Sequence, residues 1–340
     1  MSKFRTGPVN SLTDIAGLKV GNAGDQRLRS GVTVIVPDEP VTASVMVLGG
    51  APGTRETDLL DPHNSVEKVH ALVLSGGSAF GLDAASGVQA ALREQGRGFA
   101  IGPHIIPIVP AAIIFDLANG APKDWGRYPP YRELGYEAAL AAATQFETGS
   151  AGAGLGALTA TVKGGLGTAS TVLGDGTTVA ALVIANPVGS PLVGETHHFW
   201  AAPFEIGGEF GGLGLPSPMP GDADGLRIKF RDMRRQGIEN TTIAVIATDA
   251  ALSKAECKRL AVAAHDGFAR AIWPVHTPLD GDLVFSLATG SRPRPADGDA
   301  FIDLCAAASA TMARAIARGV HDASPADGDL YPAWCTLGRG

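Results

Sequence analysis

The chain has few cysteines and no arrangement of them that suggests pairing. Only Cys257, Cys305 and Cys335 occur among its 340 residues, and they form no CxxC motif and leave an odd thiol. Disulfides form in oxidising compartments and are rare where thiols are kept reduced. This cysteine content is therefore typical of a protein of the reducing cytoplasm.

A basic character and long apolar runs are also missing. The 27 Lys and Arg against 34 Asp and Glu give a formal net charge of −7, which argues against nucleic acid as a partner. Residues 1–8 hold no apolar signal core, and the best apolar candidate, 105–117, is short and contains Pro107 and Pro110. We expect no segment of membrane-spanning length, and thus a cytoplasmic protein without a membrane partner.

Glycine and apolar side chains are abundant instead. The chain has 45 glycines and is 45% hydrophobic, which suffices for a large core, as one long domain or two fused ones. The glycines stand between short β-branched runs, where they allow tight turns and close approach of backbones. We expect strands at 31–36, 42–48, 71–74, 177–184, 243–248 and 283–287.

Segments with helical periodicity alternate with these runs. In the clearest one, Ser253 and Glu256 have capping-box spacing, and Cys257, Leu260 and Ala264 fall on one face of the predicted helix. Alternation of strands and helices predicts an α/β layered fold. The expected helices span 79–95, 136–143, 253–272 and 301–318.

Several familiar site motifs fail on inspection. Residues 152–157 fit G-x-G-x-x-A by letter, but no strand-like run precedes them, as dinucleotide binding requires. The stretch 76–80 misses the G-x-S-x-G elbow because position 80 is Phe. His197 and His198 lack the spacing of a zinc motif. The sequence therefore predicts neither a cofactor nor a metal.

The junction between Asn240 and Thr241 is the most informative feature that remains. A Thr hydroxyl stands at the entry of the strand-like run 243–248, directly after a peptide bond that could be cut. A Thr that becomes an N-terminus carries its own base, because its α-amine has a pKa of about 7.7–8.0. Two plainer interpretations are an ordinary polar strand entry and an N-x-[ST] glycosylation acceptor, the latter without an export signal.

The junction follows a long irregular region, residues 202–240. Its first part is rich in Gly and Pro, and its second part is basic, with Arg227, Lys229, Arg231, Arg234 and Arg235. The charges favour a solvated surface loop. A loop of this length is usually functional or disordered, and this one could give the chain slack after a cut.

Four further polar residues, in three segments, lie in apolar or Gly-rich surroundings. Lys163 precedes Gly164-Gly165, Asn186 follows the run 177–184, and Asp280 and Asp282 precede the run 283–287. Taken one at a time, the plainer interpretations are favoured: a surface lysine, an Asn-Pro turn and an Asp-Gly-Asp hairpin.

Together these segments resemble the P1 family of peptidases, the DmpA-type or S58 aminopeptidases, which includes D-aminopeptidases, β-aminopeptidases and nylon-oligomer hydrolases. The resemblance covers almost the whole chain. Motifs in the family's order carry it: 12–21 (LTDIAGLKVG), 49–58 (GGAPGTRETD), 74–83 (LSGGSAFGLD), 109–117 (VPAAIIFDL), 186–189 (NPVG), the Asn240-Thr241-Thr242 junction and 276–282 (HTPLDGD).

The resemblance implies a four-layer αββα sandwich of N-terminal-nucleophile type that cuts itself into an α chain, 1–240, and a β chain, 241–340. It implies that Thr241 attacks first Asn240 and then substrate amides. Residues matching Lys163 and Asn186 line the site in the nylon-hydrolase branch, and a pair matching Asp280 and Asp282 orients the nucleophile. It further implies a small peptide or amide substrate and a homo-oligomer, α4β4 in relatives.

One departure concerns the oxyanion or substrate pocket, where some relatives have a Tyr at the position of Phe115. Because Phe115 has no hydroxyl, that role falls to Asn186, Lys163 or a backbone N–H. Relatives with a Ser nucleophile carry Ser and Glu in place of Asp280 and Asp282, so substrate preference does not transfer from them. Two other functions stay open: an acyl transferase similar to ornithine acetyltransferases, and a binding protein that is never cut.

Overall fold

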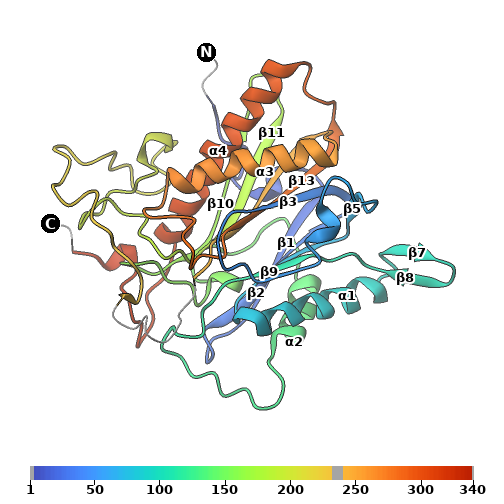
Figure 1. Ribbon diagram of the computed structural model, residues 1–340, viewed down its shortest axis with the longest axis horizontal. Helices are drawn as coiled ribbons and strands as arrows, with labels where there is room; N and C mark the ends of the chain where they lie inside the picture. Colours follow the sequence, from blue (N-terminus) through green and yellow to red (C-terminus); the bar gives the residue numbers. More distant parts are fainter. Residues whose placement is uncertain (1–3, 232–239, 339–340) are drawn as a thin grey trace.

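The computed structural model describes residues 4–231 and 240–338 (Figure 1). The expectations for Arg234, Arg235 and the rest of 232–239, the end of the irregular region 202–240, lie outside the described residues. Of the irregular region, the described part contains one short helical turn, η5 (Ala202–Phe204), which agrees with the prediction.

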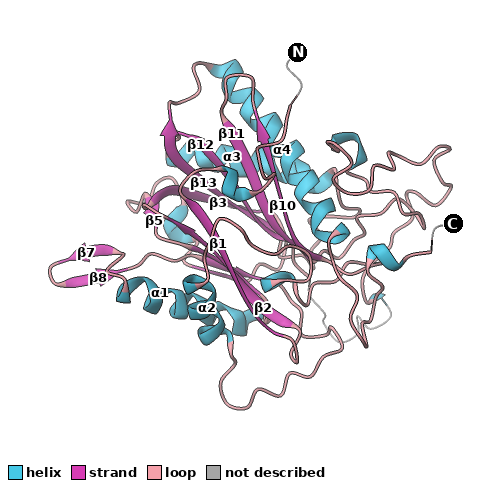
Figure 2. Cartoon of the chain, turned by 180° about the vertical axis from the view of Figure 1, so that it is seen from behind, coloured by secondary structure: helices cyan, strands magenta, loops and turns pink. Residues whose placement is uncertain are grey.

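Two β-sheets form the inner layers of the fold (Figures 1 and 2). Most strand pairs are antiparallel, but two are parallel: β6 (Leu72–Ser75) with β9 (Ala111–Ile113), and β12 (Ile243–Ala250) with β13 (Leu283–Arg292). The first sheet has the order β1 (Leu18–Asp25), β2 (Ser30–Pro37), β6 (Leu72–Ser75), β9 (Ala111–Ile113), β4 (Thr54–Arg55). The second has the order β10 (Gly165–Val172), β11 (Thr178–Ala185), β12 (Ile243–Ala250), β13 (Leu283–Arg292), β3 (Val41–Val47), β5 (Lys68–Val69).

Helices cover the outer face of each sheet. Helices α1 (Ala84–Glu94) and α2 (Tyr131–Leu140) lie on the first sheet, and α3 (Lys254–Ala269) and α4 (Gly298–His321) on the second (Figure 1). The remaining elements are a hairpin of β7 (Phe99–Ile101) and β8 (His104–Ile106) and the 3₁₀ turns η1 (Leu12–Asp14), η2 (Asp58–Leu60), η3 (Ser78–Asp83), η4 (Gly152–Gly154) and η7 (Trp334–Thr336).

Three apolar cores separate these four layers, and the alternation of side chains along the strands produces them. In β2, Val32, Val34 and Val36 pack under α1 and α2, whereas Ile35 faces the second sheet. A third core lies between the second sheet and α3 and α4. The architecture is therefore the expected αββα sandwich.

The predicted elements are present with shifted bounds. The capping box of Ser253 and Glu256 opens α3, and the segment predicted as one helix at 79–95 begins as a 3₁₀ turn and continues as α1. Helix α2 starts at Tyr131, five residues before the predicted 136.

Helix α4 corrects the expectation that no segment reaches membrane-spanning length. Its 24 residues are long and apolar enough to cross a membrane, judged by length and composition alone. The helix packs on β10, β11 and α3, and most of its residues are buried. Its apolar character is thus accounted for by the third core.

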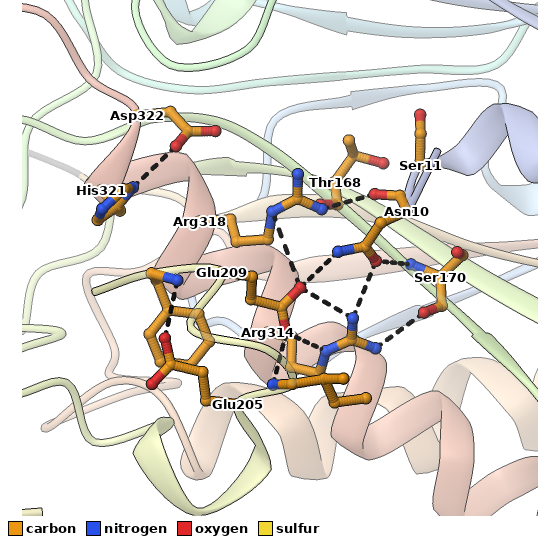
Figure 3. A network of polar contacts seen from close by, with 12 residues as sticks. Asn10, Ser11, Thr168, Ser170, Glu205, Glu209, Arg314, Arg318, His321 and Asp322 are labelled. Atoms are coloured by element: carbon orange, nitrogen blue, oxygen red, sulfur yellow. Dashed lines mark hydrogen bonds and ion pairs between the residues drawn. The ribbon is translucent and has the colours of Figure 1, made fainter. Parts of the chain in front are cut away.

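A buried polar network fastens the irregular region to α4 (Figure 3). Arg314 of α4 is almost fully buried and binds the carboxylate of Glu209 through Nε at 2.5 Å and Nη2 at 2.9 Å. Asn10 donates to the same carboxylate at 2.6 Å, and Arg314 also donates to the carbonyl oxygen of Ser170 at 2.8 Å. Residues from four distant parts of the sequence are therefore held at one point.

Candidate active site

Strand register brings the junction, Asn186 and the acid pair to one end of the second sheet. In the antiparallel pair of β11 and β12, Ile184 lies opposite Ile243, so Asn186, just beyond the end of β11, lies level with Thr241. In the parallel pair of β12 and β13, Ile243 lies opposite Leu283. A bridge between Asn240 and Asp280 continues that register, which puts Gly281 beside Thr241.

The peptide bond between Asn240 and Thr241 is buried and held on both sides. Asn240 and Thr241 are 1% and 2% exposed. The Asn240 N–H donates to the carbonyl of Leu279 at 3.0 Å, and the Thr241 N–H donates to the carbonyl of Asn186 at 3.2 Å. The bond is thus fixed between the end of β11 and the segment before β13.

Two donors converge on the carbonyl oxygen of that peptide. The Thr241 hydroxyl lies 2.5 Å from the Asn240 oxygen, and the backbone N–H of Gly281 donates to the same oxygen at 2.9 Å. A Cβ at position 281 would lie 2.6 Å from the Ala51 oxygen and 2.8 Å from the Thr241 Oγ. Only glycine therefore lets this N–H approach the carbonyl, which it polarises.

The two carboxylates flank the junction but bind its neighbours rather than the Thr241 hydroxyl. Asp280 accepts from the Val188 N–H at 3.0 Å and from the Thr277 hydroxyl at 2.7 Å. Asp282 accepts from the Thr242 N–H at 2.8 Å. Burial and the nearby Asp282 carboxyl raise the pKa of Asp280 to about 6.

Asp282 also begins a chain of two histidines. Its second oxygen lies 2.9 Å from Nδ1 of His276, and Nε2 of His276 lies 3.2 Å from Nδ1 of His265. Burial lowers the pKa of His265 to about 4, which favours its neutral form. The chain ends on the Met46 carbonyl, 3.0 Å from Nε2 of His265. Asp282 is therefore fixed from the side opposite the junction.

The side-chain amide of Asn186 is held in a defined orientation. Its Oδ1 accepts from the Leu158 N–H at 3.0 Å and from Nζ of Lys229 at 2.9 Å. Its Nδ2 donates to the carbonyl of Phe115 at 3.1 Å. Phe115 thus contributes a backbone carbonyl here, while its ring packs beside Leu158.

An isolated β-bridge pairs Lys163 with Leu158, whose N–H binds Asn186, but the ammonium group of Lys163 binds a residue outside this group. Its side chain is 5% exposed, and its Nζ pairs with the carboxylate of Asp329 at 2.8 Å. The interpretation of Lys163 as a surface lysine is therefore wrong. No hydrogen bond joins it to Thr241 or Asn186 within the described ranges.

Two members of the site were missed at the sequence level. The sequence presents Gly281 only as the turn residue between two aspartates. A glycine at that place is nevertheless a signal of close backbone approach. Lys229 was assigned to a solvated loop, which is wrong, because it is 1% exposed. Lys229 lies between Ile228 and Phe230 in a run of basic residues. The local sequence pattern therefore does not predict that this lysine is buried.

Within residues 4–231 and 240–338, no group of three or more His, Cys, Asp or Glu side chains is placed to hold a metal ion. The groups that the structure brings to the junction and its neighbours are the Thr241 hydroxyl, two carboxylates, the Asn186 amide, the Lys229 amine and backbone N–H donors. A hydroxyl next to a polarised carbonyl is an arrangement for acyl transfer.

The family model described as peptidase family S58 matches residues 10–330. The chain therefore belongs to this family of hydrolases of peptide and amide bonds. An uncharacterised aminopeptidase of Mycobacterium tuberculosis is 43% identical, over 95% of this chain and 98% of its own. A 6-aminohexanoate-oligomer endohydrolase of a Kocuria species is 30% identical, over 83% of this chain and 76% of its own.

Solved structures agree in fold. A β-aminopeptidase of a Burkholderia species superposes with a TM-score of 0.72 at 23% identity, covering 98% of this chain and 93% of its own. An L-aminopeptidase D-Ala-esterase/amidase of Ochrobactrum anthropi, described as a variant of the Ntn hydrolase fold, gives 0.69 at 22%, with the same coverage. The sandwich is thus an Ntn-hydrolase fold.

Proposed function

We propose that this S58 peptidase is a self-processing amide hydrolase with Thr241 as its nucleophile. The observation that carries the proposal is the convergence of the Thr241 hydroxyl and the Gly281 N–H on the Asn240 carbonyl oxygen. The predicted products are an α chain, 1–240, and a β chain, 241–340, that remain one domain.

The cut proceeds as an N→O acyl shift followed by hydrolysis. The Thr241 Oγ attacks the Asn240 carbonyl carbon and loses its proton, and the C–N bond breaks. The departing nitrogen takes up a proton and becomes the α-amine of Thr241. Water then hydrolyses the Asn240 ester, which leaves an Asn240 carboxylate and restores the hydroxyl. The Gly281 N–H stabilises the oxyanion, and a donor of this kind typically contributes about 3–4 kcal/mol.

Substrate hydrolysis uses the same atoms after the cut. The α-amine of Thr241 accepts the hydroxyl proton as the oxygen attacks a substrate amide, and water resolves the acyl-enzyme. In the uncut chain this nitrogen is held by the Asn186 carbonyl, and Asp280 and Asp282 supply negative charge for the ammonium form. Asn186 and Gly281 would then face the substrate oxyanion.

The substrate class is proposed from the relatives and from the apolar side chains close to Asn186. Leu158 and Phe230 form an apolar cluster with Phe115 and Tyr331, which suits a small acyl group with an apolar body. We propose short peptides or linear ω-amino acid amides, given the aminopeptidase and 6-aminohexanoate-oligomer relatives. A homo-oligomer in the cytoplasm completes the proposal.

The test is the intact mass of purified protein, with N-terminal sequencing of each fragment. Dividing 34.7 kDa by chain length predicts pieces of about 24 and 10 kDa, the smaller one beginning at Thr241. Thr241→Ala should stay whole and inactive. Thr242→Val is the matched control, because the Thr242 hydroxyl is buried without a partner in the described chain, and it should cut normally.

Activity is then measured on alanine and β-alanine p-nitroanilides and on the linear dimer of 6-aminohexanoate. A wild-type chain that stays whole but hydrolyses these amides would refute the mechanism. A cut chain that transfers an acetyl group from acetylornithine to glutamate, but hydrolyses no amide, would favour the acyl transferase instead.

A further inference from the structure

Lys229 is a deeply buried lysine whose side chain contacts Asn186 of the candidate site. It lies on the segment that leads to the junction, and its backbone N–H donates to the carbonyl of Val188 at 2.9 Å. The next residue, Phe230, packs on Leu158 and lies 5.9 Å from the Tyr331 ring, measured between ring centroids. Lys229 is therefore anchored both by its backbone and by its neighbour.

Three oxygen atoms surround its ammonium group. Nζ lies 2.6 Å from the carbonyl of Leu158, 3.1 Å from the carbonyl of Asn186 and 2.9 Å from Oδ1 of Asn186. A lysine ammonium has three donors and no acceptor. All three donors are thus used, and two of them end on one residue.

This donor-only group determines which way the Asn186 amide faces. An amide can be turned so that its oxygen and nitrogen exchange places, but a protonated Lys229 rejects the nitrogen at that position. The Leu158 N–H makes the same demand on Oδ1. Nδ2 must then point to the other side, where one N–H meets the Phe115 carbonyl and the second has no partner in the described chain.

We propose that Lys229 is a positioning residue that holds the Asn186 amide with its Nδ2–H directed at the reacting carbonyl, in self-cleavage and in hydrolysis. This inference rests on the proposed function. Lys229 itself need not touch the substrate, because it acts through Asn186. Among the described lysines, this proposal gives the role at the site to Lys229 and not to Lys163.

The charge and the burial of Lys229 indicate that this residue does not serve to stabilise the fold. Burial lowers the pKa of Lys229 to about 7, although Asp280, Asp116 and Asp282 all favour its charged form. A buried cation costs desolvation free energy that an apolar side chain of similar length would not. Replacement by methionine should therefore leave the fold intact and damage the chemistry.

The experiment is a double-mutant cycle on the rate of self-cleavage, followed by intact mass from the time of purification. Lys229→Met and Asn186→Ala should each slow the cut by roughly ten- to a thousandfold, and the double variant should be no slower than Asn186→Ala. Lys254→Met is the matched control. Lys254 is also buried and donates to two backbone carbonyls, of Leu59 and Asn64, but far from Asn186.

A second readout separates positioning from folding. In the fraction that is cut, Lys229→Met should lower kcat with little change in KM, and its Tm should stay near that of Lys254→Met. Lys229→Gln, a neutral side chain that can both donate and accept, should also be slow.

Each remaining outcome overturns a different claim. If wild type never cuts, the proposed function fails. If wild type cuts and Lys229→Met and Lys229→Gln keep pace with Lys254→Met, or if the two losses are additive, only the role of Lys229 fails.

Discussion

The pair of Glu209 and Arg314 gives the sharpest stability prediction. Glu209→Gln keeps the shape of the side chain but leaves the Arg314 guanidinium, 1% exposed in its side chain, without a counter-charge. Breaking one partner of a buried ion pair typically costs about 3–5 kcal/mol. At about 2.1 cal/mol/K per residue, 340 residues have an unfolding entropy near 0.7 kcal/mol/K, so Tm should fall by about 4–7 °C.

The assay is a thermal melt in the Thr241→Ala background, in which the proposed mechanism expects the chain to stay whole. Glu205→Gln is the control. Glu205 is on the same loop, and its Oε1 accepts from the backbone N–H groups of Phe210 and Gly212, which a Gln oxygen can also do. Its Tm should stay within about 1 °C of the background, because no buried charge loses its partner.

The pH dependence of the Glu209→Gln effect provides an independent check. Burial acts to raise the pKa of Glu209, but its hydrogen bond and charge interaction with Arg314 outweigh it, and the net pKa is lowered. A lowered folded-state pKa gives stability that is present above the unfolded value, about 4.3, and lost as pH falls through the folded value. The difference between the two proteins should therefore be constant near neutral pH and shrink in acid. A Glu209→Gln variant as stable as its background at pH 7 would refute the argument.

Two more variants test the junction. Gly281→Ala should slow self-cleavage at least about tenfold, because its Cβ would press on the Ala51 oxygen and the Thr241 Oγ and push the N–H from the carbonyl; intact mass over time measures this, and an unchanged rate would contradict it. Asp280→Asn should reduce the change in the free energy of unfolding with pH between about 4 and 6. Because the folded pKa of Asp280 is raised to about 6, the native state binds the extra proton, and stability falls as pH rises from about 4 to 6. Melts of the Thr241→Ala protein with and without Asp280→Asn should differ in that window, and parallel curves would contradict the assignment.

Periodicity was enough to predict the second sheet's centre and the helices, but not the strands β1 and β10. Both contain glycines, which weaken any strand pattern. The structure explains them by packing: a Cβ at Gly21 would lie 1.9 Å from the Ala138 oxygen of α2, and one at Gly167 equally close to the Ala315 oxygen of α4. Contacts between elements that are distant in sequence decide these positions, and a local pattern cannot register them.

The candidate site divides in the same way. Thr241, Asn186 and the two aspartates stand at strand ends, where sequence and family resemblance find them, and the structure brings them together. Lys229 has no such local mark, because its burial depends on Leu158 and Asn186, both more than forty residues away. Lys163 has a suggestive Gly-rich context, yet its ammonium group pairs with Asp329, which is far from it in the sequence.

The order of strands in the second sheet determines whether the protein could refold after a cut at the junction. Strands β12 and β13 follow the junction, but they lie between β11 and β3, which precede it. A cut at Asn240 would therefore leave two chains that share one sheet, with the adjacent strands β12 and β13 of the shorter chain flanked on both sides by strands of the longer chain. The two chains could part only by unfolding. Refolding would then require two chains to meet, so stability after the cut depends on protein concentration. We expect the chain to fold before it is cut. Once the two chains have been separated by unfolding, we expect them to refold poorly into the cut protein.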